Sequence, residues 1–326
     1  MNGARIIACF LILGFLLTQG CTHYKEIRDS PGPTLFIPEA VNASQVVRYA
    51  PALLVHNPDQ EYNRIASPTA KADLNGNVHI SMETGQPRIY VETAPFETDS
   101  GRYTNFIYRV HFPGTPLSLF PFFIGAGSNM GLLVVMTVNE AGDPVLVTTA
   151  GTCGCYVAII PTDRLDAKAF PAGWKDTPVH IYGETLPSML RVGNAKRLMV
   201  EIRPGEHRVM GLEMIAPESL NSVSIIPTGL SAVEDLERIP VHRRDGKKEE
   251  ISLFYRSGPL AGHVRGAWKP WETLLLSVLS MDLVVGMDKK YGHPLNPFYT
   301  SLKPWNRESS DMSDFVRFLR YYGWRL

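Results

Sequence analysis

Short stretches in which apolar and polar residues alternate recur from about residue 50 onward. In the clearest, residues 103–112, aromatic and apolar side chains occupy one set of alternate positions, while Asn105, Arg109 and His111 occupy the other. Successive side chains of an extended chain point to opposite faces, so this period of two predicts a half-buried β-strand. The pattern therefore predicts a protein that is rich in β-structure.

Residues that favour tight turns join several of these stretches in pairs. Glycine, asparagine and aspartate tolerate the positive φ angles that tight turns require, and each turn predicts a hairpin. The predicted hairpins join residues 71–74 to 78–82 across Asn75-Gly76, 132–138 to 145–149 across Gly142-Asp143, 198–203 to 208–215 across Pro204-Gly205, and 239–243 to 251–255 across Asp245-Gly246. A further buried strand is predicted over residues 156–160.

Two helices are predicted near the C-terminus. Residues 271–287 are apolar on nearly all sides and follow Pro270, which favours a helix start. This run is too short to span a bilayer and carries Asp282, so we expect it to lie in the core. Residues 310–322 have Ser310 as the expected N-cap and Gly323 just after the last turn.

The predicted fold class is α+β: a strand-rich body of antiparallel sheets, packed as a sandwich or in a barrel-like arrangement and closed by C-terminal helices. One globular domain is expected over residues 45–326, with a possible subdivision near 231–238.

The charges of the chain are balanced, with Lys+Arg and Asp+Glu equal at 32 each. This balance argues against a nucleic-acid partner, because phosphate binding requires a concentrated basic surface.

The first 20 residues have the three parts of a secretory signal peptide. Arg5 supplies a positive charge, residues 6–17 form an uninterrupted apolar run, and Thr18-Gln19-Gly20 follow. As a helix, the run would extend only about 18 Å, too little to cross a hydrocarbon core of about 30 Å. We therefore expect residues 1–20 to be removed on export.

Gly20-Cys21, directly after the apolar run, resembles the lipobox of bacterial lipoproteins, although Thr18 and Gln19 stand where leucine and a small residue are commoner. The resemblance covers only about the first 22 residues. It implies cleavage before Cys21, acylation of that cysteine with fatty acids such as palmitate, and attachment to a membrane. Thr22, rather than aspartate, implies the outer membrane, facing the periplasm, in a Gram-negative host. The alternative is an ordinary cleaved signal with an incidental cysteine.

Residues 21–44 are predicted to be the lipidated N-terminus and a tether, since Pro31, Pro33 and Pro38 favour an extended chain. Once the signal peptide is removed and Cys21 is acylated, the only thiols left are Cys153 and Cys155, in Gly-Thr-Cys-Gly-Cys-Tyr. Two cysteines one residue apart have several possible roles in an exported protein.

The Cys153–Cys155 pair has four interpretations, which the sequence leaves open. A disulfide between them would be redox-active, because a small ring is strained. Two free thiolates would bind zinc or copper, with His111, His207 or His263 completing the ligand set. One thiolate would act as a nucleophile if His111 or His207 lowered its pKa. The pair would otherwise be structural, as a local staple or as buried thiols.

Other polar residues are weaker candidates. Arg109 and His111 share a strand face, which suits an anionic ligand, and His207-Arg208 lies just after a turn. Residues 262–272 combine histidine, arginine and tryptophan before a helix, a composition found both in ligand sites and where tryptophans cap a core. The sequence contains no Gly-x-Ser-x-Gly, P-loop, dinucleotide or His-Glu-x-x-His motif.

The sequence therefore predicts a membrane-anchored, exported lipoprotein that binds a ligand or partner in the cell envelope. The alternative is a thiol-based redox, metal-binding or hydrolytic protein centred on Cys153 and Cys155. Whether the protein is an enzyme is left open.

Overall fold

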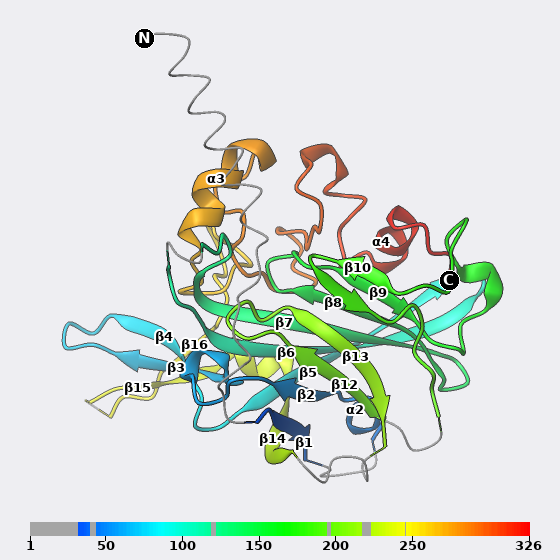
Figure 1. The fold of residues 1–326 in the computed structure, drawn as a ribbon. Coiled ribbons are helices and arrows are strands. Elements are labelled where there is room, and N and C mark those ends of the chain that lie inside the picture. The colour runs from blue at the N-terminus through cyan, green and yellow to red at the C-terminus, as the bar shows by residue number, and fades with distance from the viewer. Residues whose placement is uncertain (1–31, 40–43, 119–121, 194–196, 217–222, 245) are drawn as a thin grey trace.

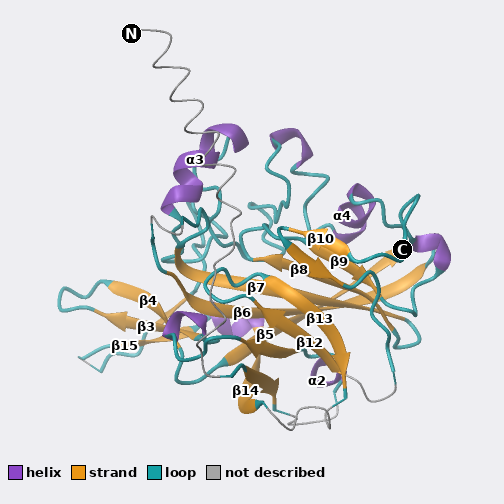
Figure 2. Cartoon of the chain, in the orientation of Figure 1, coloured by secondary structure: helices purple, strands orange, loops and turns teal. Residues whose placement is uncertain are grey.

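A computed structural model describes residues 32–39, 44–118, 122–193, 197–216, 223–244 and 246–326. The predicted signal peptide and Cys21 lie outside the described residues. The described chain is a strand-rich α+β structure with one large curled sheet, a half-barrel, and few helices (Figures 1 and 2), which confirms the predicted fold class. None of the described helices has the length and apolar character needed to cross a membrane.

The large sheet has ten strands in the order β13-β12-β2-β1-β14-β5-β6-β7-β8-β9. In chain order they are β1 (Thr34–Pro38), β2 (Ala52–Val55), β5 (Arg88–Thr98), β6 (Gly101–Thr115), β7 (Gly127–Asn139), β8 (Pro144–Gly151), β9 (Ala158–Pro161), β12 (Arg197–Ile202), β13 (Val209–Ile215) and β14 (Ser224–Ala232). The sheet is mixed rather than wholly antiparallel, because β14 lies parallel to both β1 and β5, and β12 lies parallel to β2. These parallel pairs join segments that are distant in sequence.

Consecutive strands β5 to β9 are antiparallel and include the predicted 132–138/145–149 hairpin. The prediction that residues 103–112 form a half-buried strand is correct for the strand, now β6, but wrong for its burial. Asn105, Arg109 and His111 are all buried, at 1%, 2% and 0% exposed. The reason is that β6 has a core on each face.

One core lies against the face of β6 that carries Phe106, Tyr108 and Val110, together with residues of β1, β2, β12 and β13. The other contains Ile107 of β6 and Leu133 of β7, and it is covered by C-terminal residues that include Phe315 and Phe318. The sequence pattern could not show this second layer, because the C-terminal segment that supplies it lies some two hundred residues further along the chain.

A smaller sheet, in the order β16-β15-β3-β4, contains β3 (Ser67–Ala72), β4 (Val78–Glu83), β15 (Ile239–His242) and β16 (Glu250–Ile251). The β3–β4 and β15–β16 pairs confirm two predicted hairpins, and β12–β13 confirms a third. β10 (Val179–Ile181) and β11 (Glu184–Leu186) form a separate pair. The possible subdivision near 231–238 falls on the short 3-10 helix η4 (Val233–Glu237), between β14 and β15.

The helices are short: α2 (Gln45–Arg48), α3 (Pro270–Ser280), α4 (Phe315–Tyr321) and the 3-10 turns η1 (Glu61–Asn63), η2 (Ala167–Ala169) and η5 (Pro304–Asn306). The predicted helix over 271–287 was too long, because Met281 adopts the left-handed conformation and ends α3. Its expected place in the core was also wrong: Leu274 is 67% and Val278 83% exposed. The N-cap of α4 is Asp314, whose side chain accepts a hydrogen bond from Arg317 N, and not Ser310.

Candidate functional site beside the Cys153–Cys155 disulfide

Cys153 and Cys155 are joined by a disulfide in the turn between β8 and β9. Their Cα atoms are 5.6 Å apart. Gly154 N donates to Gly151 O at 2.8 Å, and Gly151 N donates to Cys155 O at 2.8 Å. The two cysteines therefore lie on a hydrogen-bonded turn and not on an extended strand, so the chain brings the two sulfur atoms together locally.

Gly154 allows this turn to form and to pack. Its φ angle is +89°, in the left-handed region that favours glycine. A Cβ atom at this position would also lie 2.1 Å from the carbonyl oxygen of Tyr299. The disulfide turn is thus pressed against the backbone at Tyr299, which forms one wall of a pocket.

The pocket has a volume of about 270 Å³ and lies between the disulfide turn, α3 and residues 299–302. Its lining is mainly aromatic and aliphatic, with contributions from Tyr156, Tyr182, Leu276, Val285 and Tyr299. Both cysteines line it; Cys153 is 6% exposed, whereas Cys155 is only half-buried. A small molecule in this pocket would therefore meet the disulfide from the Cys155 side.

Arg208 brings a positive charge to the pocket wall. Its guanidinium pairs with Glu206 (Nη1 to Oε2, 2.9 Å) and Glu184 (Nη2 to Oε1, 3.0 Å), and its Cζ lies 5.5 Å from the centre of the Tyr156 ring. Burial acts to raise the pKa of Glu184, but its hydrogen bonds and charge interactions with Arg203 and Arg208 outweigh this and lower it. Arg208 is thus held in place by two carboxylates, and the lowered pKa keeps the one on Glu184 charged.

Glu272, on the first turn of α3, brings an acidic group to the same pocket. Burial raises the pKa of Glu272, although nearby Lys269 opposes the shift. Lys269 Nζ lies 3.2 Å from Asp288 Oδ1 but 4.0 Å from Glu272 Oε2. Because Lys269 is engaged mainly by Asp288, the Glu272 carboxyl is the less neutralised acid and can donate or accept a hydrogen bond inside the pocket.

Lys289 lies directly behind the disulfide turn and is fully buried. Its backbone N donates to Thr152 O at 2.8 Å, and its Nζ lies 3.1 Å from the centre of the Tyr299 ring. Among the described residues, Nζ has no hydrogen-bond acceptor. Burial lowers the pKa of Lys289 to about 7, although the charge of Asp282 opposes the shift.

The three candidate histidines do not line this pocket. His111 Nε2 accepts a hydrogen bond from Arg109 Nε at 3.1 Å, and burial together with the Arg109 charge lowers the pKa of His111. Because Arg109 is itself buried and donates from Nη1 to Lys289 O at 2.7 Å, the pair is a core feature and not an open anion site.

His207 stacks on Phe112 with ring centres 4.2 Å apart, and its Nε2 lies 2.7 Å from Tyr62 O. His263 is buried beside Asn296, whose Nδ2 lies 3.2 Å from His263 Nδ1. In the described part of the chain, no three His, Cys, Asp or Glu residues are grouped so that they could hold a metal ion. The zinc or copper interpretation requires both cysteines as free thiolates, and it stays a prediction for the reduced protein.

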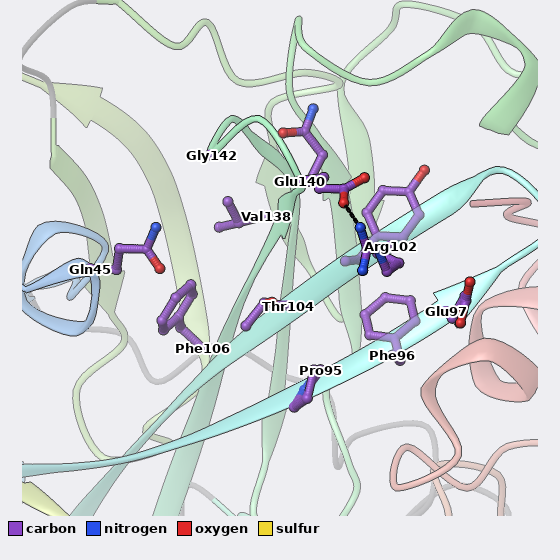
Figure 3. Close-up of a pocket in the computed structure, with 12 residues that line it drawn as sticks. Gln45, Pro95, Phe96, Glu97, Arg102, Thr104, Phe106, Val138, Glu140 and Gly142 are labelled. Carbon is purple, nitrogen blue, oxygen red and sulfur yellow. Dashed lines mark hydrogen bonds and ion pairs between the residues drawn. The ribbon is translucent and has the colours of Figure 1, made fainter.

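A second pocket, of about 630 Å³, runs along β5, β6 and β7 (Figure 3). Arg102 and Glu140 form an ion pair at one side of it, and Gln45 of α2 lies at the other. The side chains of this ion pair are 70% and 61% exposed, so solvent screens their charges. The disulfide pocket combines buried charged groups with apolar walls, and it is therefore the stronger candidate site.

Sequence reasoning identified the two cysteines but missed Tyr182, Lys289 and Tyr299. Arg208 and Glu272 carry only weak signals in the sequence, where they belong to the His207-Arg208 pair and to residues 262–272. Trp268, in the second of these segments, is 58% exposed and does not cap a core. Comparisons of this chain with models of protein families, with curated proteins and with solved structures found no match.

Proposed function

We propose that this chain is an exported lipoprotein, anchored through Cys21 to a bacterial membrane, that binds a small organic ligand in the pocket beside Cys153 and Cys155. In a Gram-negative host, Thr22 favours the outer membrane, with the domain in the periplasm. The observation that carries the ligand-binding proposal is the pocket itself: a mainly apolar cavity of about 270 Å³ whose lining also includes Arg208 and Glu272. Such a combination is typical of small-molecule sites.

The chemistry of the walls restricts the ligand. Three tyrosine rings favour a flat or partly aromatic molecule. Arg208 is already paired with two carboxylates, so an anion would gain little from it, whereas a hydroxyl or carbonyl group can bond to Arg208 or Glu272. We expect a neutral, aromatic molecule with one or two polar groups.

Phenol is a suitable probe because it combines one ring with one hydroxyl. We expect phenol to raise the melting temperature of the protein saturably, since a ligand of the folded state stabilises it. Leu276→Trp should abolish the effect by filling the pocket, whereas Leu275→Trp, on the adjacent residue that does not line the pocket, should retain it. An unchanged phenol response in Leu276→Trp would refute binding at this site.

The proposed anchor has its own test. Mass spectrometry of the protein from bacterial membranes should find a mature N-terminus at residue 21 with fatty acid on it, and Cys21→Ser should release the protein into the soluble envelope fraction. A mature N-terminus elsewhere, or an unmodified Cys21, would overturn the anchor.

Thiol–disulfide exchange is a second candidate, favoured by the unequal exposure of the two cysteine residues. An incoming thiolate would attack Cys155 Sγ, break the Cys153–Cys155 bond, form a mixed disulfide with Cys155 and release Cys153 as the thiolate. A second thiolate from the reductant would then free Cys155, so a dithiol is oxidised as the protein pair is reduced.

Reduction of the folded protein by dithiothreitol, followed by mass-tagging of free thiols, tests this exchange. We expect two tagged thiols without loss of the fold. In a separate incubation without dithiothreitol, Cys153→Ser should react with oxidised glutathione, form a mixed disulfide at Cys155 and release one reduced glutathione. A disulfide that resists reduction until the protein unfolds would show that the bond is only a structural staple.

A further inference from the structure

Exposed apolar side chains are concentrated at one end of the molecule. Residues 274–305 hold more than half of the large apolar side chains that are exposed in the described chain. We call them the apolar crest; they are Leu274 (67%), Val278 (83%), Leu279 (65%), Met281 (76%), Leu283 (84%), Leu295 (77%), Leu302 (45%) and Trp305 (77%). Most soluble proteins bury such side chains, and a group of this size marks an interaction surface.

The crest is one continuous feature built from two segments. Arg307 donates from Nη2 to Ser280 O, and Tyr299 OH donates to Asp282 Oδ2, so residues 299–307 are fastened to the end of α3. Figure 1 shows α3 and the neighbouring dark-orange turn projecting from the same end of the molecule, beyond the large sheet. The crest therefore lies at one end of the molecule, where one of its members, Leu302, also lines the pocket beside the disulfide.

The charges near the crest distinguish a bilayer from a typical protein partner. Between residues 273 and 287 the only charged residue is Asp282. Its side chain is 14% exposed, lies 3.9 Å from Arg307 and accepts from Tyr299, so it faces the protein. Lys303 is exposed two residues before Trp305. A tryptophan and a lysine beside an uncharged apolar surface are suited to the headgroup region, where each keeps a polar end in water.

We infer that the apolar crest inserts into the lipid surface and lies at the acyl–headgroup boundary. α3 has 11 residues, which as a helix extend about 16 Å and cannot cross a core of about 30 Å. The crest therefore lies on the bilayer and does not span it. Insertion of several leucine, valine and methionine side chains removes apolar surface from water without burying an unpaired charge.

The inference does not depend on the proposed anchor, because Figure 1 shows β1, which follows Gly32, at the end of the molecule opposite α3. Cys21 precedes Gly32, the first described residue, by 11 positions, and 11 residues span at most about 40 Å. An acylated Cys21 would thus hold Gly32 within about 40 Å of the bilayer. The crest then supplies a second attachment that fixes which side of the domain faces the lipid.

The test uses the chain from residue 21 onward with Cys21→Ser, so that no acyl chain contributes. The probe is vesicles of phosphatidylethanolamine and phosphatidylglycerol, and bound protein is measured by flotation. We expect the binding to persist in about 0.5 M NaCl, because salt screens attraction between charges but does not weaken the insertion of apolar side chains. Bromine-labelled acyl chains should quench tryptophan fluorescence, and Trp305→Phe should remove most of that quenching.

The variant Val278→Asp with Leu283→Asp should lower the vesicle partition coefficient at least tenfold. Both side chains are more than four-fifths exposed, so the fold does not depend on them. Leu74→Asp is the matched control, since Leu74 is 83% exposed on the β3–β4 turn, and it should bind like the parent chain. Equal melting temperatures would confirm that all three chains fold alike.

Absence of flotation by the parent chain, or equal flotation of the double variant, would overturn the inference. Self-association through the crest would overturn it as well. In that case the parent chain would sediment as a dimer and fail to bind vesicles, and the double variant would sediment as a monomer. The outcome is independent of the anchor: an unmodified Cys21 would refute the lipoprotein proposal and leave the flotation result unchanged.

Discussion

At the scale of single residues, the disulfide turn depends on a glycine between the two cysteines. Gly154 combines a φ angle of +89° with close contact to the Tyr299 carbonyl. Any other residue would be strained in its backbone and would also push away the segment that walls the pocket. The Cys-Gly-Cys spacing thus links the disulfide to the packing of the C-terminal residues.

Gly154→Ala should lower the free energy of unfolding by at least about 2 kcal/mol, because left-handed strain of about 1–2 kcal/mol adds to a backbone clash. Gly258→Ala is the control, since Gly258 has a φ angle of +79° and open space around its Cβ position. It should cost only about 1 kcal/mol, the strain alone. Equal losses for the two variants, measured by urea unfolding, would refute the role of the Tyr299 contact.

At the scale of elements, α4 shows how a helix boundary depends on one side chain. Asp314 Oδ1 accepts from Arg317 N at 3.2 Å and satisfies a donor that the first turn leaves free. Ser310 is buried instead, and its hydroxyl accepts from Thr300 N and Ser301 N. Both residues favour N-caps, and the contacts of the 299–310 segment decide between them.

Asp314→Ala should therefore lower the free energy of unfolding by about 1 kcal/mol, the usual loss of an N-cap. Asp314→Asn should lose distinctly less, because its amide oxygen can still accept from Arg317 N. Chemical denaturation of the two variants measures the difference. If alanine and asparagine were equally destabilising, the exposed ion pair with Arg317, and not the cap, would be responsible.

At the scale of the whole molecule, covering both faces of the large sheet buries histidines that stay neutral. Burial lowers the pKa of His207 to about 3, although its contact with Tyr62 O opposes the shift. Between about pH 6.5 and 3 the unfolded chain therefore binds a proton at this position that the folded chain does not. The contribution of neutral His207 to the free energy of unfolding is therefore fully present above about pH 6.5, and it is lost as the pH falls toward 3.

From pH 7 to pH 5, His207 alone should remove about 2 kcal/mol from the free energy of unfolding. His207→Asn, whose side chain tolerates the φ angle of +53°, should reduce the pH dependence by that amount whatever its effect at pH 7. Urea titrations of both chains across this range give the comparison. Parallel pH profiles would show that His207 has the same pKa in the folded and unfolded chains.

The sequence by itself determined the local features of this protein. Alternation and turn residues predicted the strand β6 and the β3–β4, β7–β8, β12–β13 and β15–β16 hairpins, because neighbouring segments pair through interactions that are short in sequence. The spacing of Cys153 and Cys155 likewise permitted a local disulfide. The signal segment and Cys21 lie outside the described residues, and the lipoprotein interpretation of them stays a prediction.

Only the tertiary structure decided which surfaces are buried. β14 lies between β1 and β5, and C-terminal residues cover β6 and β7. Both arrangements depend on contacts between residues more than a hundred positions apart, and such contacts leave no periodic signal in the sequence. These contacts bury Arg109 and His111, bring Arg208 and Glu272 to the disulfide, and leave α3 exposed although its sequence resembles a core helix. Apolar character shows that a side chain must leave water, but only the fold, or a membrane, supplies the surface that covers it.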